Sequence, residues 1–140
     1  MTLNLYADGV ALTYPRVAGK YRKKAPGGFA VSTHSGSVMV DGAVLLTNES
    51  VMKAEAIAQA LRLVSTLEAE AFVIHSNCQA LVEYLNGNWK RPGYLTDNYL
   101  IQLLAQVKQS RQVFIKGLYG GNPLLEPVTA AAVEAAKIAT

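Results

Sequence analysis

The chain has 140 residues, of which 51% are hydrophobic and 16% are charged, and its formal net charge is +3. This length and composition predict one globular domain, residues 1–140, and exclude disordered, collagen-like and coiled-coil proteins. A single cysteine, Cys78, excludes an internal disulfide framework and favours a reducing, cytoplasmic compartment. No apolar run is long enough to predict a membrane span, and the first residues are not typical of a signal peptide. We therefore expect no membrane partner.

The first third of the chain is predicted to form strands. Two dipeptides, Asp8-Gly9 and Asp41-Gly42, are typical of turns, and we expect the chain to reverse at each of them. Residues 14–28 predict a loop, which contains the basic cluster from Arg16 to Lys24. The alternation of apolar and polar residues predicts strands at 2–7, 29–33, 37–40 and 43–47.

Helices and strands alternate in the rest of the chain. Ser50 is the predicted N-cap of a helix whose apolar positions run to Leu67, and Pro127 is the predicted first residue of a final helix. Between them the pattern predicts a strand at 71–75, a helix at 79–86, a helix from Thr96 or Asp97 to Val107, and a strand at 112–116. The strand at 71–75 is apolar almost throughout, so we expect it to be central and parallel. This order predicts a mixed sheet covered by helices.

Polar side chains fall at the ends of several predicted elements. Asp8, Asn77 and Glu126 flank strands or the last helix, and Glu55 lies one turn into the first helix. Loops converge at such positions to form sites, and carboxylates gathered there would bind a hard divalent cation such as magnesium. The structural alternative makes Asp8 a turn residue, Glu126 a charge at a helix start and Glu55 an exposed helix residue.

Short segments of the chain also resemble a known family. They are, in order, Leu5–Gly9, Pro26–Ala30, Ala54-Glu55, Ile74–Gln79, Asn88–Arg91, Lys116-Gly117 and Asn122–Glu126. Together they resemble the type 1 ribonuclease H family over nearly the whole chain. The resemblance implies a ribonuclease H-like α/β fold, a five-stranded mixed sheet with helices on both faces. It also implies an endonuclease that cuts the RNA strand of RNA–DNA hybrids by two-metal-ion hydrolysis, with Mg²⁺ as cofactor and Mn²⁺ as a substitute.

The resemblance gives four residues candidate roles as catalytic residues and metal ligands. Asp8 and Glu55 match the family's first catalytic aspartate and its catalytic glutamate, while Asn77 and Glu126 match the other two aspartates. Asn77 is neutral where the family has a charge, which weakens metal binding and predicts reduced or absent activity. Leu118 stands where many members have a histidine. Asn77 has two open explanations: a naturally degenerate site, or an engineered replacement of aspartate.

A short polar segment is the predicted nucleic-acid surface. Asn88, Trp89, Lys90 and Arg91 lie between two predicted helices, where the family often carries a basic protrusion, and Gln79 matches a residue that contacts the hybrid. Lys90 and Arg91 would neutralise phosphates, with Trp89 packed beneath them. The alternative is a solvated helix connection with a core tryptophan.

The expected partner is an RNA–DNA hybrid or another duplex, bound by a monomer. The basic cluster from Arg16 to Lys24 adds either a second phosphate-contacting surface or solubility. The alternative function is a non-hydrolytic ribonuclease H-fold module that binds nucleic acid or protein. A third hypothesis is an interaction domain with no nucleic-acid role.

Overall fold

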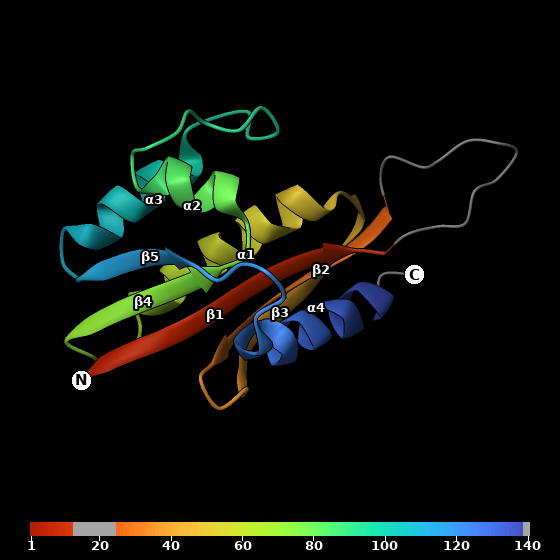
Figure 1. The fold of residues 1–140 in the computed structure, drawn as a ribbon, viewed down its shortest axis with the longest axis horizontal. Helices are drawn as coiled ribbons and strands as arrows, with labels where there is room; N and C mark the ends of the chain where they lie inside the picture. The colour runs from red at the N-terminus through yellow and green to blue at the C-terminus, as the bar shows by residue number, and fades with distance from the viewer. Residues whose placement is uncertain (13–24, 139–140) are drawn as a thin grey trace, which may run out of the picture.

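A computed structural model describes residues 1–12 and 25–138 of the chain. Figure 1 shows the elements in chain order. They are β1 (Thr2–Ala11), β2 (Ala25–Thr33), β3 (Val38–Thr47), α1 (Glu49–Val64), β4 (Ala71–Ser76), α2 (Gln79–Leu85), α3 (Tyr99–Lys108), β5 (Val113–Gly117), the short 3₁₀ helix η1 (Pro123–Leu125) and α4 (Glu126–Ile138). The basic cluster from Arg16 to Lys24 lies outside the described residues. In the described part of the chain, no helix has the length and apolar character needed to cross a membrane.

The five strands form one mixed sheet in the order β3-β2-β1-β4-β5. β1 pairs antiparallel with β2, which pairs antiparallel with β3, whereas β4 is parallel to both β1 and β5. The predicted fold class is confirmed. The prediction that the apolar strand at 71–75 is central was wrong in one respect: β1 holds the centre, and β4 lies beside it. β4 still has two parallel neighbours, and its apolar residues Phe72, Val73 and Ile74 are buried, which explains its almost wholly apolar sequence.

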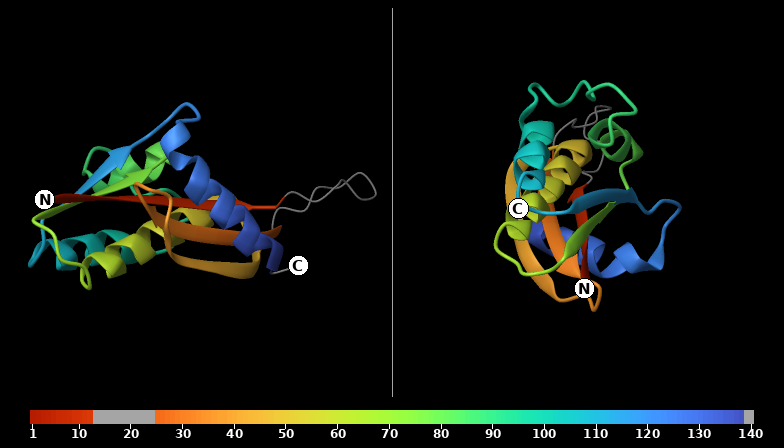
Figure 2. Two further views of the ribbon diagram at one scale, coloured as in Figure 1. Left: turned by 90° about the horizontal axis from the view of Figure 1, so that it is seen from below. Right: turned by 90° about the vertical axis from the view of Figure 1, so that its left-hand side faces the viewer.

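Helices cover both faces of the sheet, as Figure 2 shows. On one face α1, α2 and α3 pack against a large hydrophobic cluster that includes Leu5 and Ala7 of β1. On the other face η1 and α4 pack against a smaller cluster that includes Tyr6 of β1. Successive strand residues point to opposite faces, so β1 contributes alternately to the two clusters. By this alternation Asp8 points to the α4 face and Gly9 to the α1 face.

Both Asp-Gly dipeptides lie inside strands, so the turns predicted there were wrong. A side chain on Gly9 would meet the Met52 backbone of α1 at 2.1 Å, and one on Gly42 would meet the Phe29 ring at 2.3 Å. In each strand the glycine allows a neighbouring segment to approach closely. An Asp-Gly dipeptide in the sequence does not show whether its glycine serves this purpose or forms a turn. The chain reverses between β2 and β3 at Gly36, whose φ is +89°.

Several element ends differ from the predicted ones. Asn48, not Ser50, caps α1, because its Oδ1 accepts the backbone N–H of Val51 at 2.9 Å. Pro127 is the second residue of α4, because η1 precedes this helix and α4 already begins at Glu126. β2 begins at Ala25, inside the predicted loop, and its first residues are buried.

Candidate functional site

Asp8 is the most buried charged side chain of the described residues and the centre of the candidate site. Its residue is 1% exposed, within β1. The pairing of β1 with β4 ends at Tyr6 opposite His75, so Asp8 lies just past the point where the two parallel strands part. The backbone N–H of Gly9 donates to Asp8 Oδ1 at 2.8 Å. This burial excludes the interpretation of Asp8 as an exposed turn residue.

Helices from both faces of the sheet bind the Asp8 carboxylate. From α1, Lys53 Nζ lies 2.6 Å from Asp8 Oδ1, and only 13% of the Lys53 side chain is exposed. From α4, the Thr129 hydroxyl donates to Asp8 Oδ2. Glu49, one turn before Lys53, lies 3.9 Å from the same ammonium group and is largely exposed. Both oxygens of Asp8 are therefore already hydrogen-bonded, and its charge is neutralised by a lysine.

A cavity of about 580 Å³ opens along the start of α4, and Thr129, which donates to Asp8, lines it. Its polar lining includes Asn77, Glu126 and Thr129, and the remaining wall is largely apolar. Asn77 Oδ1 is buried and has no hydrogen-bond partner among the described residues. Glu126 is exposed at the first turn of α4. The structure thus brings Asn77 and Glu126 to one cavity, and Thr129 connects that cavity to Asp8.

Glu55 does not join this group. Its carboxylate accepts a hydrogen bond from Gln59 Nε2 at 2.8 Å and lies 3.7 Å from Arg62. It lines a separate hollow of about 430 Å³ between β3 and α1. Residues two apart on a helix point in nearly opposite directions, so Lys53 reaching Asp8 turns Glu55 away from it. The α1 residue beside Asp8 is therefore the positively charged Lys53 and not Glu55.

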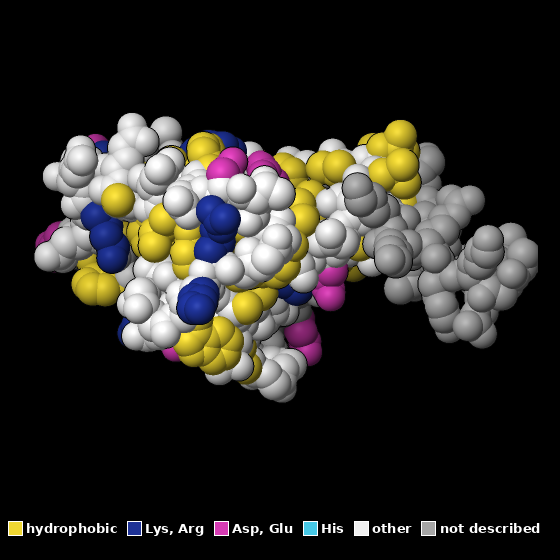
Figure 3. Space-filling model, turned by 90° about the horizontal axis from the view of Figure 1, so that it is seen from above, with side chains coloured by type: hydrophobic (Ala, Val, Ile, Leu, Met, Phe, Trp, Pro, Cys, Tyr) yellow, Lys and Arg dark blue, Asp and Glu magenta, His cyan; other side chains and the backbone are white. Residues whose placement is uncertain are grey.

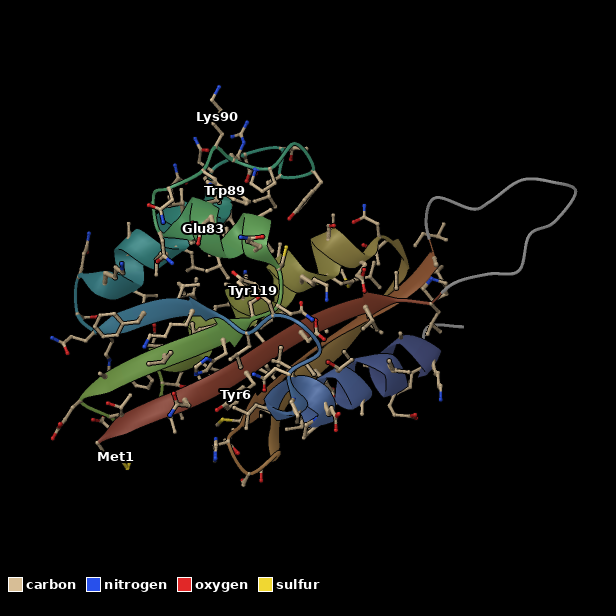
Figure 4. All side chains as sticks on the ribbon, in the orientation of Figure 1. Met1, Tyr6, Glu83, Trp89, Lys90 and Tyr119 are labelled. Carbon is tan, nitrogen blue, oxygen red and sulfur yellow. The ribbon has the colours of Figure 1, made fainter. Side chains whose placement is uncertain are left out.

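The predicted binding segment connects α2 to α3 and is exposed throughout. Trp89 is 50% exposed, which excludes a core tryptophan, and Lys90 points away from the sheet (Figure 4). Arg91 donates to Asn98 Oδ1 at 2.9 Å, and Asn88 donates to Glu83 at 3.2 Å. On the face seen from above, Lys and Arg side chains lie among hydrophobic ones, beside a small acidic patch (Figure 3).

Gln79, the remaining predicted contact residue, is the first residue of α2. Its side chain is exposed, two residues after Asn77. Its contact with a hybrid stays a prediction.

His75 is packed and hydrogen-bonded, as the sequence predicted. Its ring stacks on Tyr6 with 4.7 Å between centroids, and its Nε2 lies 3.0 Å from Asn4 Oδ1. Burial lowers the pKa of His75, and the nearby positive charge of Lys116 and the ring of His34 lower it further. The imidazole is therefore neutral near pH 7.

Comparison with solved structures identifies the architecture. The N-terminal ribonuclease H domain of a Mycobacterium tuberculosis protein, solved as a fusion, matches with a TM-score of 0.72 and 18% identity, covering 99% of this chain and 95% of that one. LC11-RNase H1 from compost, solved with an RNA/DNA hybrid, matches with a TM-score of 0.71 and 17% identity over 98% of both chains. The RNase H1 of Halobacterium salinarum matches with a TM-score of 0.63 and 14% identity over 99% of both.

The chain has a ribonuclease H-like fold. No protein-family model and no curated protein match the sequence. At identities of 14–18%, this likeness establishes how the chain folds. What the chain does has to be argued from its own residues.

The described side chains of this ribonuclease H-like fold show no cluster of metal-ligating residues. Magnesium requires near-octahedral oxygen ligands at about 2.0–2.1 Å, usually with one or two carboxylates. No group of three or more histidine, cysteine or acidic side chains in residues 1–12 and 25–138 is placed to hold a metal ion. The Lys53 ammonium lies against Asp8 Oδ1, where it would repel a second cation. The roles of Asp8, Glu55, Asn77 and Glu126 as metal ligands stay predictions.

Two residues at the centre of the candidate site, Lys53 and Thr129, were missed from the sequence. Lys53 has a recognisable signal, because it lies between Met52 and Ala54, both of which are buried in α1. A lysine flanked by core positions is seldom buried without a paired acid. Thr129 has no comparable signal. It lies in an alanine-rich helix, and the sequence does not show whether its small polar side chain faces the sheet or solvent.

Proposed function

We propose that this chain is a ribonuclease H-fold domain that binds RNA–DNA hybrids and, with its present residues, does not cut them. The fold supports the first half, because a structure with the same fold was solved holding an RNA/DNA hybrid. The site supports the second half, because the one buried acid in residues 1–12 and 25–138 is paired with a lysine, and the cavity nearby is lined by an amide at position 77.

The exposed segment between α2 and α3 carries the binding half of the proposal. Lys90 extends into solvent as a point charge suited to a phosphate, next to the half-exposed Trp89 ring (Figure 4). The hydrogen bond from Arg91 to Asn98 holds the end of the segment against the start of α3. Such phosphate contacts position a duplex without reading its sequence, so we expect shape recognition with little base preference.

The charges at the site support the second half of the proposal, that the chain does not cut hybrids. Two-metal hydrolysis needs several negative ligands within a few ångströms, to hold both the attacking water and the leaving oxygen. Here Lys53 compensates Asp8, Asn77 is neutral, and Glu55 faces Arg62. Two acids line the cavity beside Asn77, Glu126 and Glu134, and they lie about two helix turns apart on α4.

A second candidate, the hybrid-cutting endonuclease, is favoured by one observation. Asn77 Oδ1 is a buried oxygen without a partner, in the same cavity as Glu126. An oxygen so placed is free to accept a ligand. In this function Asp8, Glu55, Asn77 and Glu126 would be the acting residues, and replacing Asn77 with Asp would restore the missing charge.

Binding is tested with a fluorescent 18-base-pair RNA–DNA hybrid and a matched DNA duplex, titrated in EDTA at several salt concentrations. We expect Lys90→Ala to weaken hybrid binding and to reduce the slope of log K against log salt by about 1. Lys108→Ala, an exposed lysine at the opposite end of α3, is the matched control and should change neither. Absence of salt-sensitive binding by the unaltered chain contradicts the proposal and favours a protein-interaction domain.

Cleavage is tested on the same hybrid with Mg²⁺ or Mn²⁺. The unaltered chain should give no product, and product would favour the endonuclease. Asn77→Asp, measured alongside, decides whether the missing charge is the only obstacle. If Asn77→Asp binds hybrid and still gives no product, the endonuclease hypothesis fails.

A further inference from the structure

The Asp8 carboxylate has a complete set of partners without any added ion. Its Oδ1 accepts from the Gly9 N–H at 2.8 Å and from Lys53 Nζ at 2.6 Å, and its Oδ2 accepts from Thr129. Asp8 is also the only buried acidic or basic residue among the described residues. A buried carboxylate is stable when it is paired and hydrogen-bonded, and both conditions are met here by the chain itself.

The packing of Lys53 holds its side chain in place next to Asp8. Its side chain is 13% exposed, and its backbone is held in the second turn of α1. The α1 backbone at Met52 and Lys53 packs so closely on Gly9 that a Cβ there would lie within 2.4 Å of it. This contact fixes where the Lys53 backbone lies along β1 and how far it is from Asp8. The ammonium is therefore delivered to one carboxylate oxygen by the packing of the helix on the strand.

We propose that the Lys53 ammonium is the resident counter-ion of Asp8 and occupies the place of a divalent cation, so that the charge at position 53 decides whether this carboxylate can bind metal. A divalent ion at Asp8 Oδ1 would have to displace the ammonium or tolerate it at contact distance, and both cost free energy. Removing the positive charge leaves Asp8 with oxygen-bearing neighbours: Thr129 bonded to it, and Asn77 and Glu126 on the adjoining cavity. This inference does not depend on hybrid binding.

The experiment follows Mn²⁺ binding by paramagnetic broadening of backbone amide signals, together with thermal unfolding. In the unaltered chain we expect no selective broadening of the Gly9 and Thr129 amides at sub-millimolar Mn²⁺. Its melting temperature should also be the same in EDTA and in Mn²⁺. Lys53→Glu should broaden these amides and should melt roughly 3–6 °C higher at ten times its Kd for Mn²⁺. The double variant Asp8→Asn with Lys53→Glu is the control and should lose most of this response.

A second variant covers the case in which Lys53→Glu does not fold. Lys53→Gln keeps a similar length without charge, and should broaden Gly9 at a Mn²⁺ concentration at least about tenfold lower than the unaltered chain requires, a difference of about 1.4 kcal/mol. Equal broadening in Lys53→Gln and the unaltered chain overturns the proposal. Metal-dependent stabilisation of the unaltered chain that Asp8→Asn abolishes would also overturn it. Hybrid binding in EDTA is measured without metal. Failure of the Lys53 proposal is therefore distinguishable from failure of the proposed hybrid-binding function.

Discussion

Replacing Lys53 with methionine should destabilise the fold far more than a surface ion pair would. The pair is 2.6 Å long, and Asp8 is 1% exposed. At an effective dielectric constant of about 20, the gross attraction is about 6 kcal/mol. Removing one partner of a buried pair typically costs about 3–5 kcal/mol. Because Asp8 keeps its bonds to Gly9 and Thr129, we expect the lower end, about 3 kcal/mol.

That loss corresponds to a fall of about 10 °C in melting temperature for a chain of this length. It is measured by urea unfolding and thermal melts followed by circular dichroism. Asp8→Asn combined with Lys53→Met removes both charges and should recover most of the loss, giving a coupling free energy of about 2–3 kcal/mol. Arg62→Met is the matched control, since its pair with Glu55 is 3.7 Å long and exposed, and should cost under about 1 kcal/mol. Additive losses from the two single variants would refute a buried, mutually dependent pair.

Other predictions concern packing, capping and pH. Gly9→Ala should lower stability by about 3 kcal/mol or more, because its Cβ would overlap the Met52 backbone; a loss under about 1 kcal/mol in urea unfolding would contradict this. Asn48→Ala should cost about 1 kcal/mol by removing the cap on Val51, while Asn48→Asp, which keeps the acceptor, should not. The pKa of His75 is lowered on folding, so the unfolded chain binds the extra proton and stability should fall as pH drops below about 6.5. His75→Gln should flatten that decline in urea midpoints measured from pH 5 to 8, and an unchanged slope would exclude His75 as its source.

The order of elements follows from the sequence because it depends on periodicity. Strands at 29–33 and 71–75 lie inside β2 and β4, and the alternation of strands and helices that implied a mixed sheet is the one observed. Periodicity survives small errors at element ends. It does not show which strand is central, because that depends on how β1, itself half polar in sequence, is buried between two neighbours.

The site was harder to predict because its geometry depends on a contact between distant segments. Glu55 and Lys53 both lie in α1, and the sequence pattern does not establish which of them faces β1. The rotation of α1 is set where it meets Gly9, and the sequence predicts a turn at this glycine. The prediction that the first strand ends at Asp8-Gly9 therefore leaves open which α1 residue contacts Asp8.

The double attachment of Asp8 has a consequence for how the molecule opens. The hydrophobic clusters on the two faces of the sheet share no residue, yet α1 and α4 donate to opposite oxygens of one carboxylate. Detaching either helix leaves a buried anion short of a donor, which penalises partial opening on that side. The amide protons of the two layers should therefore exchange with solvent as one cooperative unit, linked by a single polar group in the central strand.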